Sequence, residues 1–256
     1  MKLSLIGHGY IGSAIARELA AQQVAFSWHR HTDVIEESDL IINAAGFTGV
    51  PNVDACEDRK EETIIGNILW PLKLEQACGD IPIIHIGSGC VYTGHKDGGW
   101  TEEDPPNFSF DNGSFYSGTK ALGQEVLAPY LHKSYLFRIR MPFGKENHPK
   151  NYFTKLRQYP KLIDVTNSLS RVDDVAKAAV WFSLNRPPYG IYNVCNEGNA
   201  SARNIVQRMG LEKEWVTQEE FSKMVKAPRS TCVLHTGKLT SVYPMPHIVD
   251  AVRECL

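Results

Sequence analysis

The chain has 256 residues, of which 43% are hydrophobic and 22% charged, and its formal net charge at pH 7 is −2. This length fits one large α/β domain, or a nucleotide-binding core with a smaller lobe. The small net charge gives no positive field that would attract nucleic acid or an anionic membrane, and no apolar run approaches the roughly 20 residues that cross a bilayer.

Six cysteines are scattered along the chain without a Cys-x-x-Cys pair. That pattern argues against a disulfide framework or a zinc site, and we expect no metal. The apolar N-terminal stretch is too short for a signal peptide. We therefore expect a cytoplasmic protein with reduced thiols.

A short apolar strand at residues 2–6 is followed by Gly7-His8-Gly9-Tyr10-Ile11-Gly12 and by a helical pattern from Ser13 to about Gln22. A strand, a glycine turn and a helix in this order form the dinucleotide-binding arrangement, in which the turn admits the pyrophosphate to the positive end of the helix dipole. The predicted cofactor contacts in this turn are Gly7, Gly9, Tyr10, Ile11 and Gly12.

The second predicted strand, residues 24–28, indicates which dinucleotide is bound. An NAD-dependent enzyme usually ends this strand with an acidic residue that binds the ribose 2′-hydroxyl. Here Ser27 stands near the end of the strand and Arg30 follows it. A hydroxyl with a guanidinium suits a 2′-phosphate, so we expect NADPH rather than NADH. The alternative for Arg30 is a solvated loop arginine.

A third strand over residues 39–43 opens into Ala44-Ala45-Gly46, small residues that let a cofactor ribose pass close to the backbone. About ten residues separate this strand from the second one, so any helix between them is rudimentary. Residues 53–78 have apolar positions at helical spacing and predict one or two helices, with Pro71 at a kink or boundary.

A buried strand at residues 81–86 leads to Ser88, Gly89 and Cys90. Chemistry in an open α/β sheet collects at the carboxyl ends of the strands, so a hydroxyl and a thiol in this place lie where a substrate can bind. The plainer interpretation is that Ser88 caps a loop and Cys90 is a small buried hydrophobic residue.

Residues 93–112 predict a loop over this edge, and a long helix begins at Phe115 and runs to about Leu131. Tyr116 and Lys120 are four residues apart and therefore share one face of that helix.

The strand predicted at residues 135–141 brings Arg140 and Pro142 to the same edge of the sheet, beside the cofactor or substrate. Further predicted elements are a helix at about 150–158, a strand at 161–165, a helix at 172–184 capped by Asp173 or Asp174, a strand at 190–194, and helices near 201–209, 217–224 and 246–254. This order predicts a Rossmann-type doubly wound parallel α/β sheet, with residues 1–150 as an NADP-binding domain and residues 151–256 mainly as a smaller, interleaved substrate-binding lobe.

The glycine turn, the Ser88 strand end and Tyr116-x-x-x-Lys120 together resemble an extended short-chain dehydrogenase/reductase. More of the chain resembles the nucleotide-4-keto-6-deoxyhexose 3,5-epimerase/4-reductases of rhamnose synthesis, through Gly46-Phe47-Thr48-Gly49-Val50-Pro51-Asn52-Val53-Asp54-Ala55-Cys56-Glu57, Arg138-Ile139-Arg140-Met141-Pro142, Asn151-Tyr152-Phe153-Thr154-Lys155 and Ala227-Pro228-Arg229-Ser230. This resemblance spans nearly the whole chain. It extends to dTDP-4-dehydrorhamnose reductases and, through the Ser-x-Cys arrangement, to GDP-fucose synthases.

The resemblance implies NADPH-dependent 3,5-epimerisation and 4-keto reduction, such as the conversion of UDP-4-keto-6-deoxyglucose to UDP-rhamnose. It implies that Tyr116 protonates the C4 oxygen, that Lys120 supports Tyr116 and the nicotinamide ribose, and that Ser88 donates a hydrogen bond to the same oxygen. It assigns Cys90 as the base of epimerisation and Lys155 as the opposing acid. The alternative for Lys155 is a solvated helix lysine.

The expected partner is a nucleotide sugar, with no nucleic acid and no membrane, and a homodimer is an open expectation. The expected sugar-nucleotide contacts are Ser88, Gly89, Arg140, Asn151, Asn167 and Arg229. For Arg140, Asn167 and Arg229 the alternative is a residue that packs the lobe. The nucleotide is left open among UDP, dTDP and GDP. Two other functions remain: a 4-reductase that receives epimerised substrate, and a non-catalytic NADP-binding regulatory subunit, because this fold also hosts binding proteins.

Overall fold

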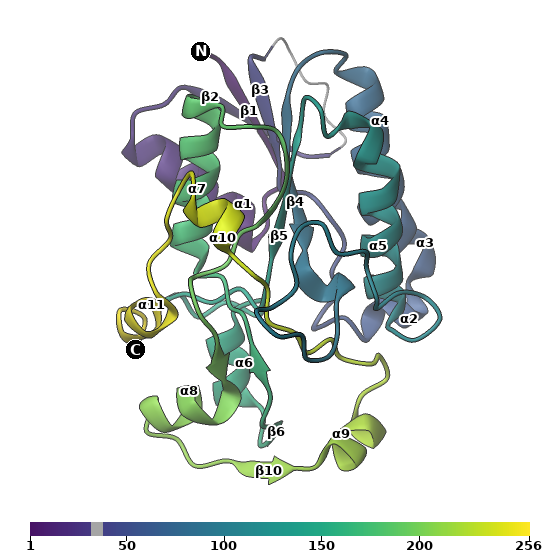
Figure 1. Cartoon of the computed structure of the whole chain (residues 1–256), viewed down its shortest axis with the longest axis vertical. Helices are drawn as coiled ribbons and strands as arrows, with labels where there is room; N and C mark the ends of the chain where they lie inside the picture. Colours follow the sequence, from purple (N-terminus) through teal and green to yellow (C-terminus); the bar gives the residue numbers. More distant parts are fainter. Residues whose placement is uncertain (32–37) are drawn as a thin grey trace.

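The structure is a computed structural model, and it describes residues 1–31 and 38–256. Within these residues six parallel strands form one sheet in the order β2-β1-β3-β4-β5-β8 (Figure 1). The strands are β1 Leu3–Ile6, β2 Phe26–His29, β3 Leu40–Asn43, β4 Ile83–Ser88, β5 Tyr135–Ile139 and β8 Gly190–Asn193. The order reverses at β1 and β3, which confirms the predicted Rossmann-type α/β class.

Helices cover both faces of this sheet (Figure 1). On one face α1 (Tyr10–Ala21) packs against α7 (Val172–Asn185), and their apolar sides enclose Leu3 and Leu5 of β1. The other face carries α2 Ala55–Asp58, α3 Lys60–Ile64, the π-helix η1 Ile65–Leu69, α4 Trp70–Ala77 and α5 Phe115–Leu127. Because both faces of the central strands are buried, these strands read as continuous apolar runs.

A smaller lobe lies at the carboxyl edge of the sheet, in the lower part of Figure 1. Its elements are α6 Tyr152–Gln158, β6 Lys161–Ile163, α8 Ala202–Arg208, β10 Glu214–Val216 and α9 Gln218–Met224. The shorter elements are the 3₁₀ turns η2 Gly89–Val91 and η3 Ala128–Tyr130, the paired strands β7 Thr166–Asn167 and β9 Ala200–Ser201, and the helices α10 Gly237–Thr240 and α11 Ile248–Arg253. Between these parts α7 and β8 return to the main sheet. The assignment of the two parts to cofactor and substrate stays a prediction.

Several predicted boundaries move, each for a local reason. Helix α1 begins at Tyr10 rather than Ser13, because Gly9 is extended and serves as its N-cap. Helix α7 is capped by Arg171, with Asp173 and Asp174 inside its first turn, where carboxylates complement the helix dipole. The short link between β2 and β3 falls largely outside the described residues.

Several strands end at other residues than predicted, and β2 and β5 bear on the site. Strand β2 spans Phe26–His29 rather than residues 24–28, so Ser27 lies inside the strand and His29 ends it. Strand β5 ends at Ile139 rather than residue 141, and Met141 has a φ of 41° in the left-handed region. None of the helices described has the length and apolar character needed to cross a membrane.

The glycine turn after β1 is packed tightly against the turn after β3. Gly7 has a φ of +104°, and a Cβ there would lie 2.7 Å from the backbone nitrogen of Ala45. A Cβ on Gly12 would lie 2.1 Å from the carbonyl oxygen of Gly7, whereas a Cβ on Gly9 would meet nothing within 4 Å. Gly7 and Gly12 therefore serve the backbone packing, and Gly9 leaves open space in front of the helix.

We expect Gly12→Ala to lower the free energy of unfolding by about 1–3 kcal/mol, because backbone must move to admit the methyl group. Gly9→Ala is the matched control and should change this free energy by less than about 0.5 kcal/mol while weakening dinucleotide binding. Urea unfolding and cofactor titration of both variants check this. Equal destabilisation by the two substitutions would contradict it.

Candidate active site

Ser88, Cys90 and Tyr116 meet at the carboxyl edge of the sheet. Ser88 is the last residue of β4, and its buried Oγ accepts a hydrogen bond from the Cys90 N–H at 3.1 Å. Tyr116 lies in the first turn of α5, which Ser114 caps by accepting from the N–H of Ser117. Ser88 lies near enough to Tyr116 to lower the pKa of its phenol. The structure therefore brings together three of the residues predicted to be catalytic.

Burial governs the protonation of Tyr116. This residue is only 7% exposed, and burial raises the pKa of its phenol well above the ordinary value. Cys90 acts in the same direction, whereas the Ser88 hydrogen bond and the Arg140 guanidinium lower this pKa. The phenol therefore keeps its proton at neutral pH and can donate it to an oxygen that becomes negative.

Lys120 lies one helical turn after Tyr116, and its Nζ is 5.8 Å from the centre of the tyrosine ring. Burial lowers the pKa of Lys120 to about 8, while Cys90 and Cys56 raise it. A Cβ placed on Gly46 would lie 3.4 Å from this Nζ. Lys120 thus stands between the tyrosine and the turn that was predicted to border the cofactor ribose.

The N-terminus of α1 presents backbone N–H groups at the switch point of the sheet, next to Ala44 and Ala45. Such a terminus attracts a pyrophosphate through its dipole and its free donors. The side chain of Tyr10 turns away, because its ring stacks on His148 with centroids 4.4 Å apart. Tyr10 and Ile11 can therefore contact a dinucleotide through backbone, and the residues present fit this group.

Ser27 is half-buried within β2 and lies two residues before the carboxyl end of that strand. Its Oγ lies 3.1 Å from Oγ of Ser4 and 2.7 Å from Nε2 of His29. The register pairs Ile6 with His29, and the Gly7 N–H donates to the carbonyl oxygen of His29 at 2.9 Å. The structure therefore places the exposed Arg30, and not Ser27, beside the glycine turn.

Arg140, expected at the substrate, lies fully buried behind Cys90. Its Nη1 donates to Sγ of Cys90 at 3.0 Å, and its Nη2 donates to Oδ1 of Asn167 and to the carbonyl oxygen of Ser230 at 2.6 Å. The same Asn167 oxygen accepts from the Cys232 N–H at 3.0 Å. Arg140 and Asn167 are thus bound within the protein beside Cys90, and their contact with the sugar stays a prediction.

Asn151, also predicted to contact the substrate, forms hydrogen bonds within the protein, and the predicted contact stays untested. This fully buried residue caps α6, because its Oδ1 accepts from the N–H of Phe153 at 2.9 Å. Its Nδ2 donates to the carbonyl oxygens of Gly144 and Glu146 at 2.7 and 2.6 Å. The side chain holds the start of the helix that carries Lys155.

The amine of Lys155 is near enough to Cys90 for the two groups to interact electrostatically. Burial, Lys150 and Arg229 lower the pKa of Lys155 to about 8, and Cys90 raises it. An amine with this pKa exchanges protons near neutral pH, which a fully solvated lysine does poorly. The alternative of a solvated helix lysine is therefore not what the structure shows.

Arg229, predicted to contact a diphosphate, forms a bidentate ion pair with Asp54 in the structure. The distances from Nη1 to Oδ1 and from Nη2 to Oδ2 are both 2.8 Å, and the Ala227 N–H donates to the same carboxylate at 2.8 Å. Burial alone would raise the pKa of Asp54, but these hydrogen bonds hold it below its usual value. The pair ties the segment around Arg229 to the start of α2.

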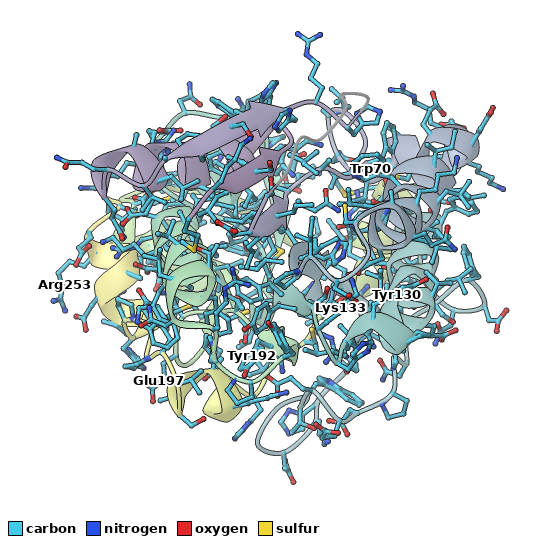
Figure 2. The ribbon with its side chains drawn as sticks, turned by 90° about the horizontal axis from the view of Figure 1, so that it is seen from above. Trp70, Tyr130, Lys133, Tyr192, Glu197 and Arg253 are labelled. Atoms are coloured by element: carbon cyan, nitrogen blue, oxygen red, sulfur yellow. The ribbon has the colours of Figure 1, made fainter. Side chains whose placement is uncertain are left out.

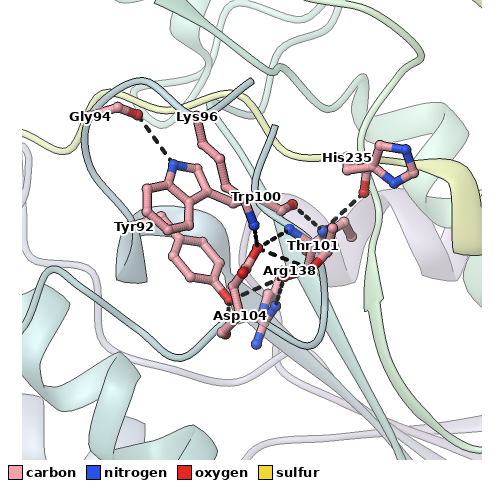
Figure 3. Close-up of polar contacts among 9 residues, drawn as sticks. Tyr92, Gly94, Lys96, Trp100, Thr101, Asp104, Arg138 and His235 are labelled. Atoms are coloured by element: carbon pink, nitrogen blue, oxygen red, sulfur yellow. Dashed lines mark hydrogen bonds and ion pairs between the residues drawn. The ribbon is translucent and has the colours of Figure 1, made fainter. Parts of the chain in front are cut away.

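The cluster of side chains in Figure 3 fixes the loop that follows Cys90 against β5 and residues 233–235. The rings of Tyr92 and Trp100 stack with centroids 5.1 Å apart, and the Arg138 guanidinium lies 5.1 Å from the centre of the Tyr92 ring. Backbone hydrogen bonds join Trp100 to residues 233–235 at 2.8–2.9 Å. The turn that carries Cys90 is thereby fixed at its exit.

Asn67 is a site residue that the sequence did not reveal. It lies in the π-helix, where its Nδ2 donates to the Phe47 carbonyl oxygen at 2.9 Å and to Oγ1 of Thr119 at 3.1 Å. Its Oδ1 accepts from the Phe47 N–H at 3.0 Å. Asn67 thus fixes the turn after β3 to the helix that carries Tyr116 and Lys120. Its place in a π-helix, which holds one residue more per turn than an α-helix, is the local feature that marks Asn67.

A buried polar chain also supports this turn, and Figure 2 labels its two ends, Trp70 and Lys133. Oδ1 of Asn43 accepts from Nε1 of Trp70 and from the Ala45 N–H, both at 3.2 Å. The Asn43 amide nitrogen therefore faces His85, and it lies 3.1 Å from Nδ1 of that ring.

Since Asn43 donates to Nδ1, the ring proton of neutral His85 is on Nε2, which lies 3.0 Å from Oε1 of Glu75. Oε2 of Glu75 accepts from Nζ of Lys133 at 2.5 Å. Burial lowers the pKa of His85 and outweighs Glu75, which raises it. The histidine is thus a neutral link between the carboxylate and the turn.

A strand, glycine turn and helix at the switch point, together with a buried tyrosine and a lysine one turn later, define an oxidoreductase of the extended short-chain dehydrogenase/reductase type, which uses a nicotinamide dinucleotide. A family model described as "RmlD substrate binding domain" matches residues 2–256. The chain belongs to this family, which confirms the resemblance found in the sequence.

Three similar proteins place the chain within this class. The bifunctional dTDP-4-dehydrorhamnose 3,5-epimerase/dTDP-4-dehydrorhamnose reductase of Arabidopsis thaliana is 34% identical over 92% of this chain and 85% of its own length. The crystal structure of the L780 UDP-rhamnose synthase of Acanthamoeba polyphaga mimivirus has a TM-score of 0.88 and 26% identity, with 100% of this chain and 98% of that chain covered. The dTDP-4-dehydrorhamnose reductase of Bacillus anthracis in complex with NADP has a TM-score of 0.80 and 18% identity, over 98% and 97% of the two chains, and shows the shared fold.

We expect His85 to remain neutral in the folded protein at about pH 6, where the unfolded chain is mostly charged because its histidines titrate near about 6.5. Since the unfolded state then binds more protons, the contribution of His85 to stability declines as the pH falls below about 6.5. Nitrogen NMR of the imidazole, with the urea-unfolded chain as control, checks this. An imidazolium signal from folded His85 at pH 6 would contradict it.

Proposed function

We propose that this chain is an NADPH-dependent 3,5-epimerase and 4-reductase of a nucleotide-linked 4-keto-6-deoxyhexose. The observation that carries the proposal is the meeting of Ser88 and Tyr116, which can grip one carbonyl oxygen, with Cys90 beside them. Epimerisation and reduction both pass through that oxygen, so one pocket can serve both. The names of the Arabidopsis and mimivirus relatives support the same substrate class.

A nicotinamide dinucleotide held by the glycine turn after β1 and by Lys120 would supply the hydride for reduction at C4. As the C4 oxygen gains the electron pair of the carbonyl bond, Tyr116 transfers its phenolic proton to it. Ser88 donates a hydrogen bond to the same oxygen and stabilises its developing charge. Lys120 offers a positive charge one helical turn away, which favours the phenolate that remains and assists its reprotonation.

In each epimerisation step the C4 carbonyl makes a neighbouring hydrogen acidic. Cys90, as the thiolate, takes this proton: a C–H bond breaks, an S–H bond forms, and the electron pair moves to the C4 oxygen as an enolate. Tyr116 and Ser88 stabilise the enolate as they do the later alkoxide. Lys155 then delivers a proton to the other face of the carbon, and the thiol and the amine exchange protons with water before the next step.

We propose NADPH as the cofactor because Arg30 follows the last residue of β2, beside the glycine turn. An acidic residue, which would bind the 2′-hydroxyl of NADH, is absent from positions 27–30. A guanidinium at this place can pair with a 2′-phosphate.

The first test incubates the protein in deuterium oxide with a 4-keto-6-deoxyhexose nucleotide and without NADPH. We expect deuterium at C3 and C5 in the wild type, seen by NMR, and loss of this exchange in Cys90→Ser. Reduction of epimerised substrate by Cys90→Ser should stay within about threefold, because hydride transfer does not use the thiol. Wild-type reduction without any exchange would leave a 4-reductase only, and the absence of NADPH oxidation would favour a binding protein.

A second test addresses the cofactor. We expect Arg30→Ala to weaken NADPH binding by about 10- to 100-fold, because a hydrogen bond to a charged group typically contributes this much to binding. NADH binding should stay unchanged. Arg208→Ala, an exposed arginine at the end of α8, is the matched control. Titration of each variant with both dinucleotides measures this. Equal loss of NADPH and NADH affinity would show that Arg30 does not read the 2′-phosphate.

A further inference from the structure

Arg140 is a fully buried cation that has no carboxylate partner within the described residues. Its hydrogen-bond acceptors are the Cys90 sulfur at 3.0 Å, the Asn167 amide oxygen and the Ser230 carbonyl oxygen. Burial lowers the pKa of Arg140, but the neighbouring thiol groups of Cys232, Cys90 and Cys195 raise it above its usual value. A guanidinium stays charged inside a protein, so this site calls for a negative group.

The other large buried arginines satisfy their charge differently. Arg171 pairs with Asp174 at 2.6 Å and with Glu254. Arg138, two residues before Arg140, lies over the Tyr92 ring and feels the carboxylates of Glu102 and Asp104. Arg140 alone among these three points a guanidinium nitrogen at a sulfur.

The direction of Arg140 is fixed by the elements around it. Strands β4 and β5 pair Ser88 with Ile139, so the chain leaves both strands side by side and brings Arg140 next to Gly89. Asn167 and Ser230 then hold one arm of the guanidinium, which leaves Nη1 on the Cys90 sulfur. The guanidinium cannot turn to a substrate without breaking these hydrogen bonds.

We propose that Arg140 is the positioning residue and counter-ion of the Cys90 thiolate during epimerisation. This inference rests on the proposed function, which needs Cys90 as a base. The hydrogen bond from Nη1 stabilises the Cys90 thiolate and orients its sulfur. When the Cys90 thiol loses its proton, the thiolate and the Arg140 guanidinium form an ion pair without net charge. Reduction of the C4 carbonyl does not use this ion pair.

Other titratable groups also face Cys90. Tyr116 and Lys120 face it from α5, Lys155 from α6, and Cys232 from the segment beside Gly89. Both lysines titrate near pH 8, where their charges decline, while the guanidinium of Arg140 persists. Arg140 therefore supplies the permanent part of the positive field at the sulfur.

The test measures the rate at which iodoacetamide alkylates Cys90 between about pH 5 and pH 10, located by mass spectrometry, in the protein without substrate. Arg140→Met should slow the reaction at pH 7 by about tenfold or more and move its rise to higher pH, since each tenfold corresponds to one pH unit of thiolate formation. Arg140→Lys, which retains a charge, should recover part of the rate. Arg208→Met, at the exposed arginine that ends α8, is the control for removal of a guanidinium and should behave as the wild type.

A second variant keeps both partners in place. Asn167→Asp has the same shape but gives Arg140 a competing carboxylate, and it should also move the alkylation profile to higher pH. Deuterium exchange should fall in Arg140→Met and Asn167→Asp while reduction of epimerised substrate is retained. Unchanged profiles in these two variants, or an equal change in Arg208→Met, would overturn the proposal. Because alkylation needs no substrate, it still reports on Arg140 if the wild type shows no exchange.

Discussion

The parallel register of β4 and β5 is the constraint on which the site depends. It pairs Ser88 with Ile139, so the two chains leave the sheet together and carry Gly89 and Arg140 into contact. A Cβ on Gly89 would lie 3.4 Å from the Arg140 side chain and 2.6 Å from Leu234, which leaves no room for a larger residue. A shift of this register by one residue would turn each side chain to the opposite face and separate the sulfur from the guanidinium.

Around this edge the protein uses burial as its main means of adjusting acids and bases. Lys120 and Lys155 both have a pKa lowered to about 8, chiefly because their charged forms lose solvation. Burial raises the pKa of Tyr116 for the same reason, because the charged form of a tyrosine is the anion. Burial at this edge therefore leaves Tyr116 protonated at neutral pH and makes the amines of Lys120 and Lys155 lose their protons more easily.

The sequence predicted those features that depend on neighbours along the chain. The glycine turn after β1 and the spacing of Tyr116 and Lys120 are local patterns, and the structure contains both as expected. The partners of Arg140 and Arg229 were not accessible in this way, because Arg229 and Asp54 are 175 positions apart and Arg140 and Ser230 are 90 apart. From the sequence both guanidinium groups are predicted to contact a ligand, whereas in the structure an internal acceptor from a distant segment binds each of them.

The hydrogen bonds from residues 227–235 to the turn and loop around Cys90 have a consequence for the order of events during synthesis. These residues supply the Ser230 acceptor of Arg140 and the backbone partners of Trp100. Strands β1 to β5 and the helices between them are translated earlier and already contain the tyrosine, the lysine and the thiol. The nascent chain can therefore bury its first core while the thiol still lacks its fixed surroundings, and the site matures only when a late segment docks.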